Sequence, residues 1–290
     1  MPASGWIDMK ATLSMNGPVL VFGGTYSNLE ATLALQREAA RLGIGPKNII
    51  CTGDVVAYCA DPVATVAAIR DWGVHVIMGN CEESLGWSKD DCGCGFEEGT
   101  ACETLSVDWY GYSNRHLGAD ARKWMRGLPW RVDVQIGARR LAVIHGAVDL
   151  VNGFVFVSTP WREKARQISL SGCDGVIGGH SGIPFTEERD GRLWHNSGAL
   201  GMPANDGTRR VWYSLFMPTR DGIEISLHPL DYDSRTAARK MRERGLPAGY
   251  ADALETGLWP SCDVLPPREL SERGAPLAVN SVSWNHAKAA

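Results

Sequence analysis

The sequence lacks a long hydrophobic run and an excess of basic charge. No stretch reaches the roughly 18 consecutive apolar residues that a membrane-spanning helix needs, although 44% of the 290 residues are hydrophobic. The net charge is -4, so the chain has no surplus of lysine and arginine to attract a nucleic acid or an anionic membrane surface. We therefore expect neither a membrane nor a nucleic acid as a partner.

A signal peptide is also missing, because residues 1–10 contain no basic segment followed by an apolar stretch. This predicts a cytoplasmic protein. The chain has eight cysteines. Without a signal peptide, we expect them to be reduced thiols or metal ligands rather than a disulfide framework.

Strand-like and helix-like segments alternate along the chain, which is typical of an α/β protein. The predicted strands are short apolar runs that end in glycine-rich loops, at residues 19–22, 49–51, 74–78, 141–144 and 176–177. Helical periodicity follows at residues 28–42, 62–72, 119–128 and 161–170. Asn28 is a suitable N-cap for the first of these helices.

Four side chains suited to metal binding each follow a predicted strand. They are Asp54 in Thr-Gly-Asp-Val-Val, Asn80 in Gly-Asn-Cys-Glu, His145 in Ile-His-Gly and His180 in Gly-His-Ser-Gly. Together they supply one carboxylate, one amide oxygen and two imidazoles. This set of ligands favours manganese, iron or zinc over calcium.

The order and spacing of these motifs resemble the calcineurin-like metallophosphoesterase family, and more closely its small bacterial phosphodiesterase branch, over residues 18–230. The five matching blocks stand at residues 23–28, 53–58, 79–82, 145–146 and 179–182. The resemblance implies a four-layer αββα sandwich with two sheets inside and helices outside. It also implies metal-dependent hydrolysis of a small phosphorylated or phosphodiester substrate.

Three positions depart from the family pattern. Gly24 and Tyr26 stand where the first block usually has aspartate and histidine, and Gly182 replaces the second histidine of the fifth block. In the family, the residues at these three positions bind only one of the two metal ions. The ligand positions of the other metal are all filled, by Asp54, Asn80, His145 and His180. We therefore hypothesise that the protein binds one divalent first-row metal ion as its cofactor.

The resemblance also suggests residues that act on the substrate. Cys81 occupies the position where many members have a proton-donating histidine, and His195 begins a segment that resembles the one closing the family's site. Tyr26 either contacts the substrate or only fills the space of the lost ion. We assign Cys81, His195 and Tyr26 as catalytic candidates. We expect Asn28 and Arg209 or Arg210 to bind the phosphoryl oxygens.

The family-like domain spans residues 18–230 after an N-terminal tail, residues 1–17, and two regions stand apart from its core. Residues 84–109 form a cysteine-containing insertion, and residues 231–290 a C-terminal helical extension and tail. The insertion is either a flexible lid or a soft-metal cluster of Cys92, Cys94 and Cys102, since thiolates bind zinc and iron. A soft-metal cluster would bind a second metal ion through thiolates, in addition to the ion at Asp54, Asn80, His145 and His180.

The function predicted from the sequence is a metal-dependent phosphoesterase that acts on a small phosphodiester. One alternative is a non-catalytic module that binds a metal or phosphate for regulation. Another is a non-hydrolytic or redox metalloenzyme that uses the cysteine-rich loop.

Overall fold

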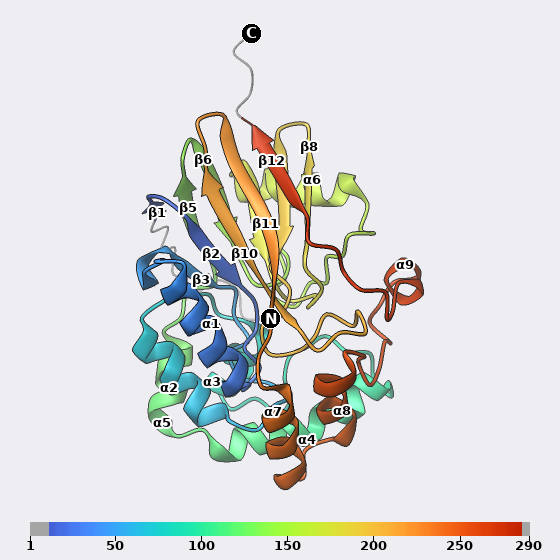
Figure 1. The fold of residues 1–290 in the computed structure, drawn as a ribbon. Coiled ribbons are helices and arrows are strands. Elements are labelled where there is room, and N and C mark those ends of the chain that lie inside the picture. Colours follow the sequence, from blue (N-terminus) through green and yellow to red (C-terminus); the bar gives the residue numbers. More distant parts are fainter. Residues whose placement is uncertain (1–11, 286–290) are drawn as a thin grey trace.

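The fold consists of two six-stranded β-sheets that face each other, with helices on both outer sides (Figure 1). The computed structural model describes residues 12–285. The strand order is β1-β5-β6-β7-β9-β8 in the first sheet and β12-β11-β10-β2-β3-β4 in the second. The predicted four-layer αββα sandwich is confirmed.

The first sheet mixes parallel and antiparallel pairs. Its strands are β1 (Thr12–Met15), β5 (Val132–Ile136), β6 (Arg139–Val143), β7 (Gly175–Gly178), β9 (Arg192–Asn196) and β8 (Phe185–Arg189). β1 pairs in parallel with β5 at the edge of the sheet. Part of the segment expected as an N-terminal tail is therefore an edge strand.

The second sheet contains the strands that lead into the first three motif blocks. Its strands are β12 (Ser281–Asn285), β11 (Gly222–Leu230), β10 (Val211–Pro218), β2 (Val19–Phe22), β3 (Ile49–Cys51) and β4 (His75–Val76). β2, β3 and β4 are parallel neighbours, so their carboxyl ends meet at one edge. β12 pairs with β11, which returns the end of the C-terminal extension to the sheet.

A hydrophobic core fills the space between the sheets. Val21 and Phe216 of the second sheet are fully buried there, together with Ile177 of the first. Trp284 of β12 is also fully buried in this cluster. Because both faces of each sheet are covered, the inner strands are apolar almost throughout, as in Val19–Phe22.

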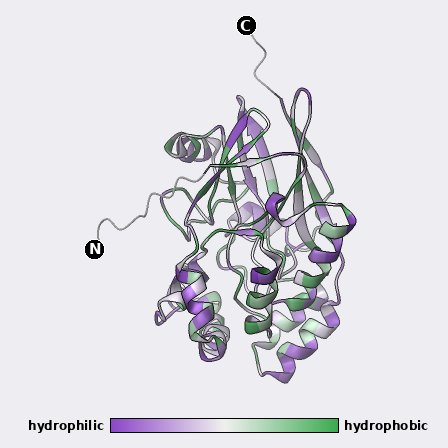
Figure 2. Cartoon of the chain, turned by 90° about the vertical axis from the view of Figure 1, so that its left-hand side faces the viewer, coloured by the Kyte–Doolittle hydropathy of each residue, from purple (hydrophilic) through white to green (hydrophobic). Residues whose placement is uncertain are grey.

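Helices complete the outer layers. α1 (Leu29–Arg41), α2 (Pro62–Trp72) and α7 (Ser234–Glu243) share a buried cluster with the second sheet, and α6 (Trp161–Ser171) covers the first. Asn28 caps α1 as predicted, since its side chain accepts a hydrogen bond from the amide of Ala31. Figure 2 shows hydrophobic and hydrophilic residues alternating along these helices, as expected of helices with one buried face.

The remaining helices surround the edge where the motif loops lie. They are α3 (Asn80–Gly86), α4 (Ala101–His116), α5 (Ala119–Arg126), α8 (Ala248–Thr256) and α9 (Pro267–Ser271). The 3-10 helix η1 (Pro46–Asn48) lies at the opposite end of the strands, where it leads into β3. The segment predicted as an insertion holds the end of α3, a loop and the start of α4. Within residues 12–285, none of the helices combines the length and hydrophobicity needed to span a bilayer.

Candidate metal centre

The loops that follow β2, β3 and β4 are held tightly against one another. The amide of Tyr26 donates to the carbonyl of Asp54 at 3.2 Å, which joins the first two loops. A Cβ atom on Gly53 would lie only 2.6 Å from the backbone nitrogen of Gly79, so this close approach requires glycine. Tyr26 and Asp54 both have positive φ, a strained conformation that is frequent at functional sites.

The four predicted metal ligands converge at this edge. His145 Nε2 lies 3.2 Å from Asp54 Oδ2, 3.1 Å from Asn80 Oδ1 and 3.1 Å from His180 Nδ1. Neighbouring ligand atoms of a tetrahedral ion with bonds of about 2.0 Å are separated by about 3.3 Å. The spacing of the four side chains therefore suits a single first-row ion.

Hydrogen bonds on the outer side orient these ligands. His145 Nδ1 lies 2.6 Å from the carbonyl oxygen of Thr52, which identifies Nδ1 as protonated and turns the lone pair of Nε2 inward. Asn80 donates through Nδ2 to the carbonyl of Cys92, so its Oδ1 faces the centre. The amide of Cys81 donates to the second carboxylate oxygen of Asp54. Several acceptor atoms thus face one another, and a cation between them would satisfy all of them.

The electrostatics of the centre favour the ligand protonation states of Asp54 and His180 but not that of His145. Burial lowers the pKa of His145, but the adjacent Asp54 carboxylate outweighs it and raises that pKa, so a metal ion competes with a proton at His145. Burial would raise the pKa of Asp54, but the adjacent His145 outweighs it and keeps that pKa below its usual value. Burial and the nearby His145 lower the pKa of His180 to about 3. Asp54 is therefore ionised and His180 neutral at pH 7, as metal binding requires.

Glu82 is an important residue that the sequence analysis missed. It is fully buried, and its carboxylate accepts hydrogen bonds from the backbone amides of Asp54, Val55, Val56 and Gly79 at 2.7 to 3.4 Å. Burial, with the Asp54 carboxylate nearby, raises the pKa of Glu82 to about 7. Glu82 fixes the loops that carry Asp54 and Asn80 relative to each other. The sequence signal was an acidic residue two positions after Asn80.

The three catalytic candidates lie in different surroundings. Tyr26 lines the pocket beside Asp54 and His180. Cys81 is buried behind Asp54, outside the lining of that pocket, and burial raises the pKa of its thiol well above the usual value. His195 is fully buried, where its ring contacts Thr186 and Phe216 between the sheets. The structure does not bring His195 to the centre, because this side chain points into the core.

The substrate-binding candidates, Asn28 and Arg209 or Arg210, make other contacts. Asn28 caps α1 and donates to the carbonyl of Gly201, so its polar groups serve the fold. Arg209 lines a separate surface depression together with Asp231 and Arg235. Arg210 pairs with Asp206. None of these three lines the pocket that contains Asp54 and His180.

The expected soft-metal cluster is not assembled. Cys92 and Cys94 are joined by a disulfide, which also corrects the expectation that these two are reduced thiols. The Cys102 thiol instead donates to Ser261 Oγ at 3.3 Å. Among residues 12–285, the acidic, histidine and cysteine side chains close enough to share an ion are Asp54, His145 and His180.

Aromatic rings lie against two of the positions, Gly24 and Gly182, where the resemblance predicts that ligands are lost. A Cβ atom on Gly24 would lie 2.3 Å from the ring of Tyr26. Gly182 has φ +71°, and a Cβ atom there would lie 3.3 Å from the ring of Trp259. An aspartate at position 24 or a histidine at position 182 would thus meet an aromatic ring. Trp259 belongs to the C-terminal extension and had no predicted role.

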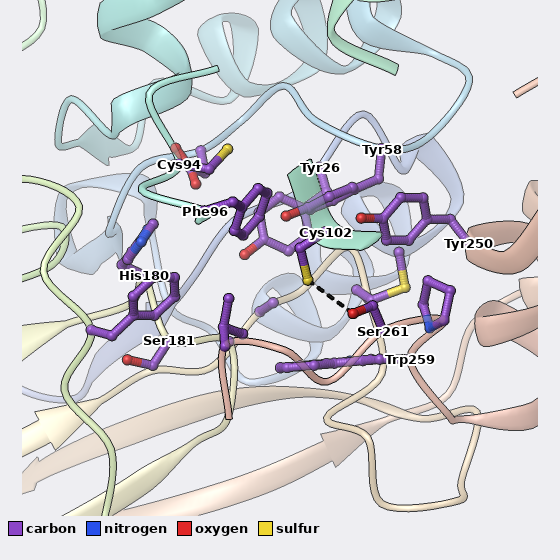
Figure 3. A pocket seen from close by; sticks show the side chains of 17 residues that line it. Tyr26, Tyr58, Cys94, Phe96, Cys102, His180, Ser181, Tyr250, Trp259 and Ser261 are labelled. Atoms are coloured by element: carbon purple, nitrogen blue, oxygen red, sulfur yellow. Dashed lines mark hydrogen bonds between the residues drawn. The ribbon is translucent and has the colours of Figure 1, made fainter. Parts of the chain in front are cut away.

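A pocket opens beside the centre, and six of its lining residues are phenylalanine, tyrosine or tryptophan. Figure 3 shows His180 at one end, Tyr250 at the other and the ring of Trp259 edge-on along one side. Tyr26, Tyr58, Phe96 and Phe154 contribute further rings. The insertion and the C-terminal extension both supply wall residues, so these two regions complete the site.

Comparison with known proteins identifies the family. The pattern described as the calcineurin-like phosphoesterase superfamily domain matches residues 19–216, more than half of the chain. The chain therefore belongs to the calcineurin-like phosphoesterase superfamily, as its motifs predicted. This is a family of phosphoesterase-type hydrolases that use divalent metals, and the chain has a candidate metal site of that kind.

Individual relatives agree with this assignment. The chain is 24% identical over 255 residues to an uncharacterized protein of Methanocaldococcus jannaschii, covering 82% of this chain and 98% of that one. It is similar in fold to a metallophosphoesterase from Sphaerobacter thermophilus, with a TM-score of 0.64, 20% identity and coverage of 84% and 100%. A hypothetical protein from Pyrococcus horikoshii has a TM-score of 0.69, 16% identity and coverage of 83% and 99%. At these identities, the solved structures show a shared fold.

Proposed function

We propose that this protein is a phosphoesterase with a single metal ion, and that it hydrolyses a small phosphodiester. The ion is manganese, iron or zinc, held by Asp54, Asn80, His145 and His180. The observation that supports this most strongly is the convergence of three ligand atoms, from Asp54, Asn80 and His180, on the fourth, His145 Nε2, at 3.1 to 3.2 Å. Aromatic rings against Gly24 and Gly182 support a single ion rather than two.

The residues around the centre divide the work. When bound, a divalent ion polarises the phosphoryl oxygens and activates water. Asp54, Asn80 and the two histidines would hold the ion, and Glu82 keeps the loops of Asp54 and Asn80 in place. Burial, with the Asp54 carboxylate nearby, raises the pKa of Tyr26, so its hydroxyl stays protonated and can donate a hydrogen bond to the substrate.

The pocket wall has no obvious acid for a poor leaving group. Its described lining contains no histidine other than His180, and Cys81 does not reach it. We therefore propose a substrate whose leaving group departs without strong protonation. The cytoplasmic location and the division into a tail, a domain at 18–230 and an extension remain predictions from the sequence.

The test measures metal content and hydrolysis together. Purified protein should hold about one ion per chain and cleave bis(4-nitrophenyl) phosphate, and Asp54→Ala should lose both. Asp71→Ala, an exposed aspartate on α2, is the matched control and should keep both. A parent protein that holds no ion at saturating manganese, iron or zinc would refute the proposal.

A regulatory binding module is the second candidate, favoured by the same lack of an acid in the pocket. It predicts one bound ion and binding of inorganic phosphate without cleavage across a broad panel of esters. Metal content and hydrolysis, measured on the same preparation, separate the two functions.

A further inference from the structure

The pocket beside the metal centre has an unusual combination of properties for a phosphoesterase site. Among its described lining residues, six are aromatic and none is lysine or arginine. The aromatic residues are Tyr26, Tyr58, Phe96, Phe154, Tyr250 and Trp259. Both properties restrict the ligand, the first through its shape and the second through its charge.

The charge of the site limits the charge of the ligand. A divalent ion beside the Asp54 carboxylate leaves at most one net positive charge, and ionised Glu82 would reduce it further. A phosphomonoester carries almost two negative charges at neutral pH. Binding it would leave an uncompensated negative charge in a largely apolar pocket, which is costly. A phosphodiester carries one negative charge, which the site can neutralise.

The aromatic wall begins directly at the centre. The ring of Phe154 lies 4.4 Å from that of His180, measured between centroids, so a group attached to a phosphoryl at the ion is within reach of Phe154. Phe96, Phe154 and Trp259 are only partly buried, and their rings offer apolar surface to a ligand. Flat apolar groups gain from stacking on such rings.

Trp259 is held rigidly in this wall. Its Nε1 donates to the carbonyl of Pro203 at 2.7 Å, and its backbone amide donates to Asn205 Oδ1 at 2.8 Å. The polar edge of the indole is thus satisfied by the protein, and the ring lines the pocket. A ring fixed in advance loses little conformational entropy when a ligand binds.

We propose that the ligand of this pocket is a singly charged phosphodiester with a flat, apolar ester group, which Trp259, Phe96 and Phe154 select. This inference rests on the proposed phosphoesterase function and names its substrate class. In the reaction, water forms a new P–O bond, one ester P–O bond breaks, and the departing alcohol takes a proton from the water. The other product is a phosphomonoester, whose added negative charge favours its release.

Calorimetric titration of the metal-loaded protein tests the proposal by binding alone. The probes are diphenyl phosphate, dimethyl phosphate and phenyl phosphate, which separate the effect of the rings from that of the charge. We expect diphenyl phosphate to bind at least about tenfold more tightly than either of the others. Equal affinity for dimethyl phosphate, tighter binding of phenyl phosphate, or no binding of any probe would overturn the proposal.

Variants of Trp259 test whether the aromatic wall of the pocket causes the selectivity for diphenyl phosphate. Trp259→Ala should reduce the ratio of affinities for diphenyl and dimethyl phosphate to below about threefold, whereas Trp259→Phe, which keeps a ring, should retain most of it. Trp87→Ala is the control, because Trp87 is 51% exposed and does not line the pocket. An unchanged ratio in Trp259→Ala would contradict the role of this residue.

Hydrolysis assays keep this inference separate from the proposed function. Selective binding of diphenyl phosphate without cleavage of bis(4-nitrophenyl) phosphate would uphold the ligand class and reject the phosphoesterase. Cleavage of that ester without selective binding would uphold the enzyme and reject the ligand class.

Discussion

The two halves of this site are built from opposite kinds of side chain. In one half, Asp54, Asn80 and His180 each bring a polar atom within 3.1 to 3.2 Å of His145 Nε2. In the other half, the rings of Tyr26 and Trp259 stand against Gly24 and Gly182. Tyr26 packs in turn on Tyr58, with 4.9 Å between ring centroids.

This contrast is what the proposed single-ion site predicts, with one set of ligands kept and the other replaced by packing. Ligands that converge without an ion leave buried polar atoms unsatisfied, so the ligands and the ion are retained or lost together. Apolar rings in their place recover packing instead. The aromatic half is therefore well packed without an ion, whereas the buried polar atoms of the other half would be satisfied by the proposed cation.

The largest expected effect comes from breaking the polar half. His145→Ala removes one of four ligands and should lower metal content from about one ion per chain to a trace, with hydrolysis reduced more than about 100-fold. Metal analysis and an ester assay measure both. Cys94→Ala should leave the stoichiometry unchanged, because Cys94 is bonded to Cys92. Two ions in the parent, with one lost only in Cys94→Ala, would contradict a single site.

A somewhat smaller effect is expected from Glu82→Ala. This change leaves buried backbone amides of residues 54–56 and 79 without an acceptor, and should lower the free energy of unfolding by about 3 kcal/mol. Metal affinity should also fall by about 10- to 100-fold, because the ligand loops lose their anchor. Urea unfolding and metal titration provide the two measurements. A change in stability within about 0.5 kcal/mol would show that Glu82 does not hold the loops.

Restoring the family's acid in the aromatic half should be unfavourable. Gly24→Asp places a side chain against the ring of Tyr26 and should cost about 1 to 3 kcal/mol of stability. The double variant with Tyr26→His relieves the clash and should be more stable than the single one. Neither should bind a second ion, since Gly182 still packs on Trp259. A stable single variant with two ions per chain would disprove the account of this half.

The smallest expected effect is the change in stability with pH that is due to His195. Burial lowers the pKa of His195 to about 3, against about 6.5 when unfolded, so below pH 6.5 the unfolded chain binds the extra proton. The contribution of His195 to stability should therefore fall by about 1 kcal/mol between pH 6.5 and 5.5. His195→Gln should flatten this dependence in urea unfolding without abolishing hydrolysis. Loss of hydrolysis in a folded, metal-loaded His195→Gln would restore its catalytic assignment.

Local sequence predicted several helices well but missed α3, α4 and α9, and it missed strands both inside the sheets and at their edges. The predicted helix at residues 62–72 has the same bounds as α2, and Asn28 caps α1, because periodicity and caps are local signals. β1 and β12 were missed, and they lie at sheet edges, where pairing to β5 and β11 defines them. The disulfide of Cys92 and Cys94 was missed as well, since bonding depends on where the loop places the two thiols.

The sequence alone predicted the family and its αββα sandwich through the resemblance of its motifs, and the four ligand candidates because each follows a predicted strand. Only the tertiary structure showed that Glu82 anchors the ligand loops and that Trp259 covers Gly182. It also showed that His195 lies in the core and that Arg209 lines a separate depression. Contacts between residues as distant in the chain as Gly182 and Trp259 leave no local pattern, so they emerge only when the chain is folded.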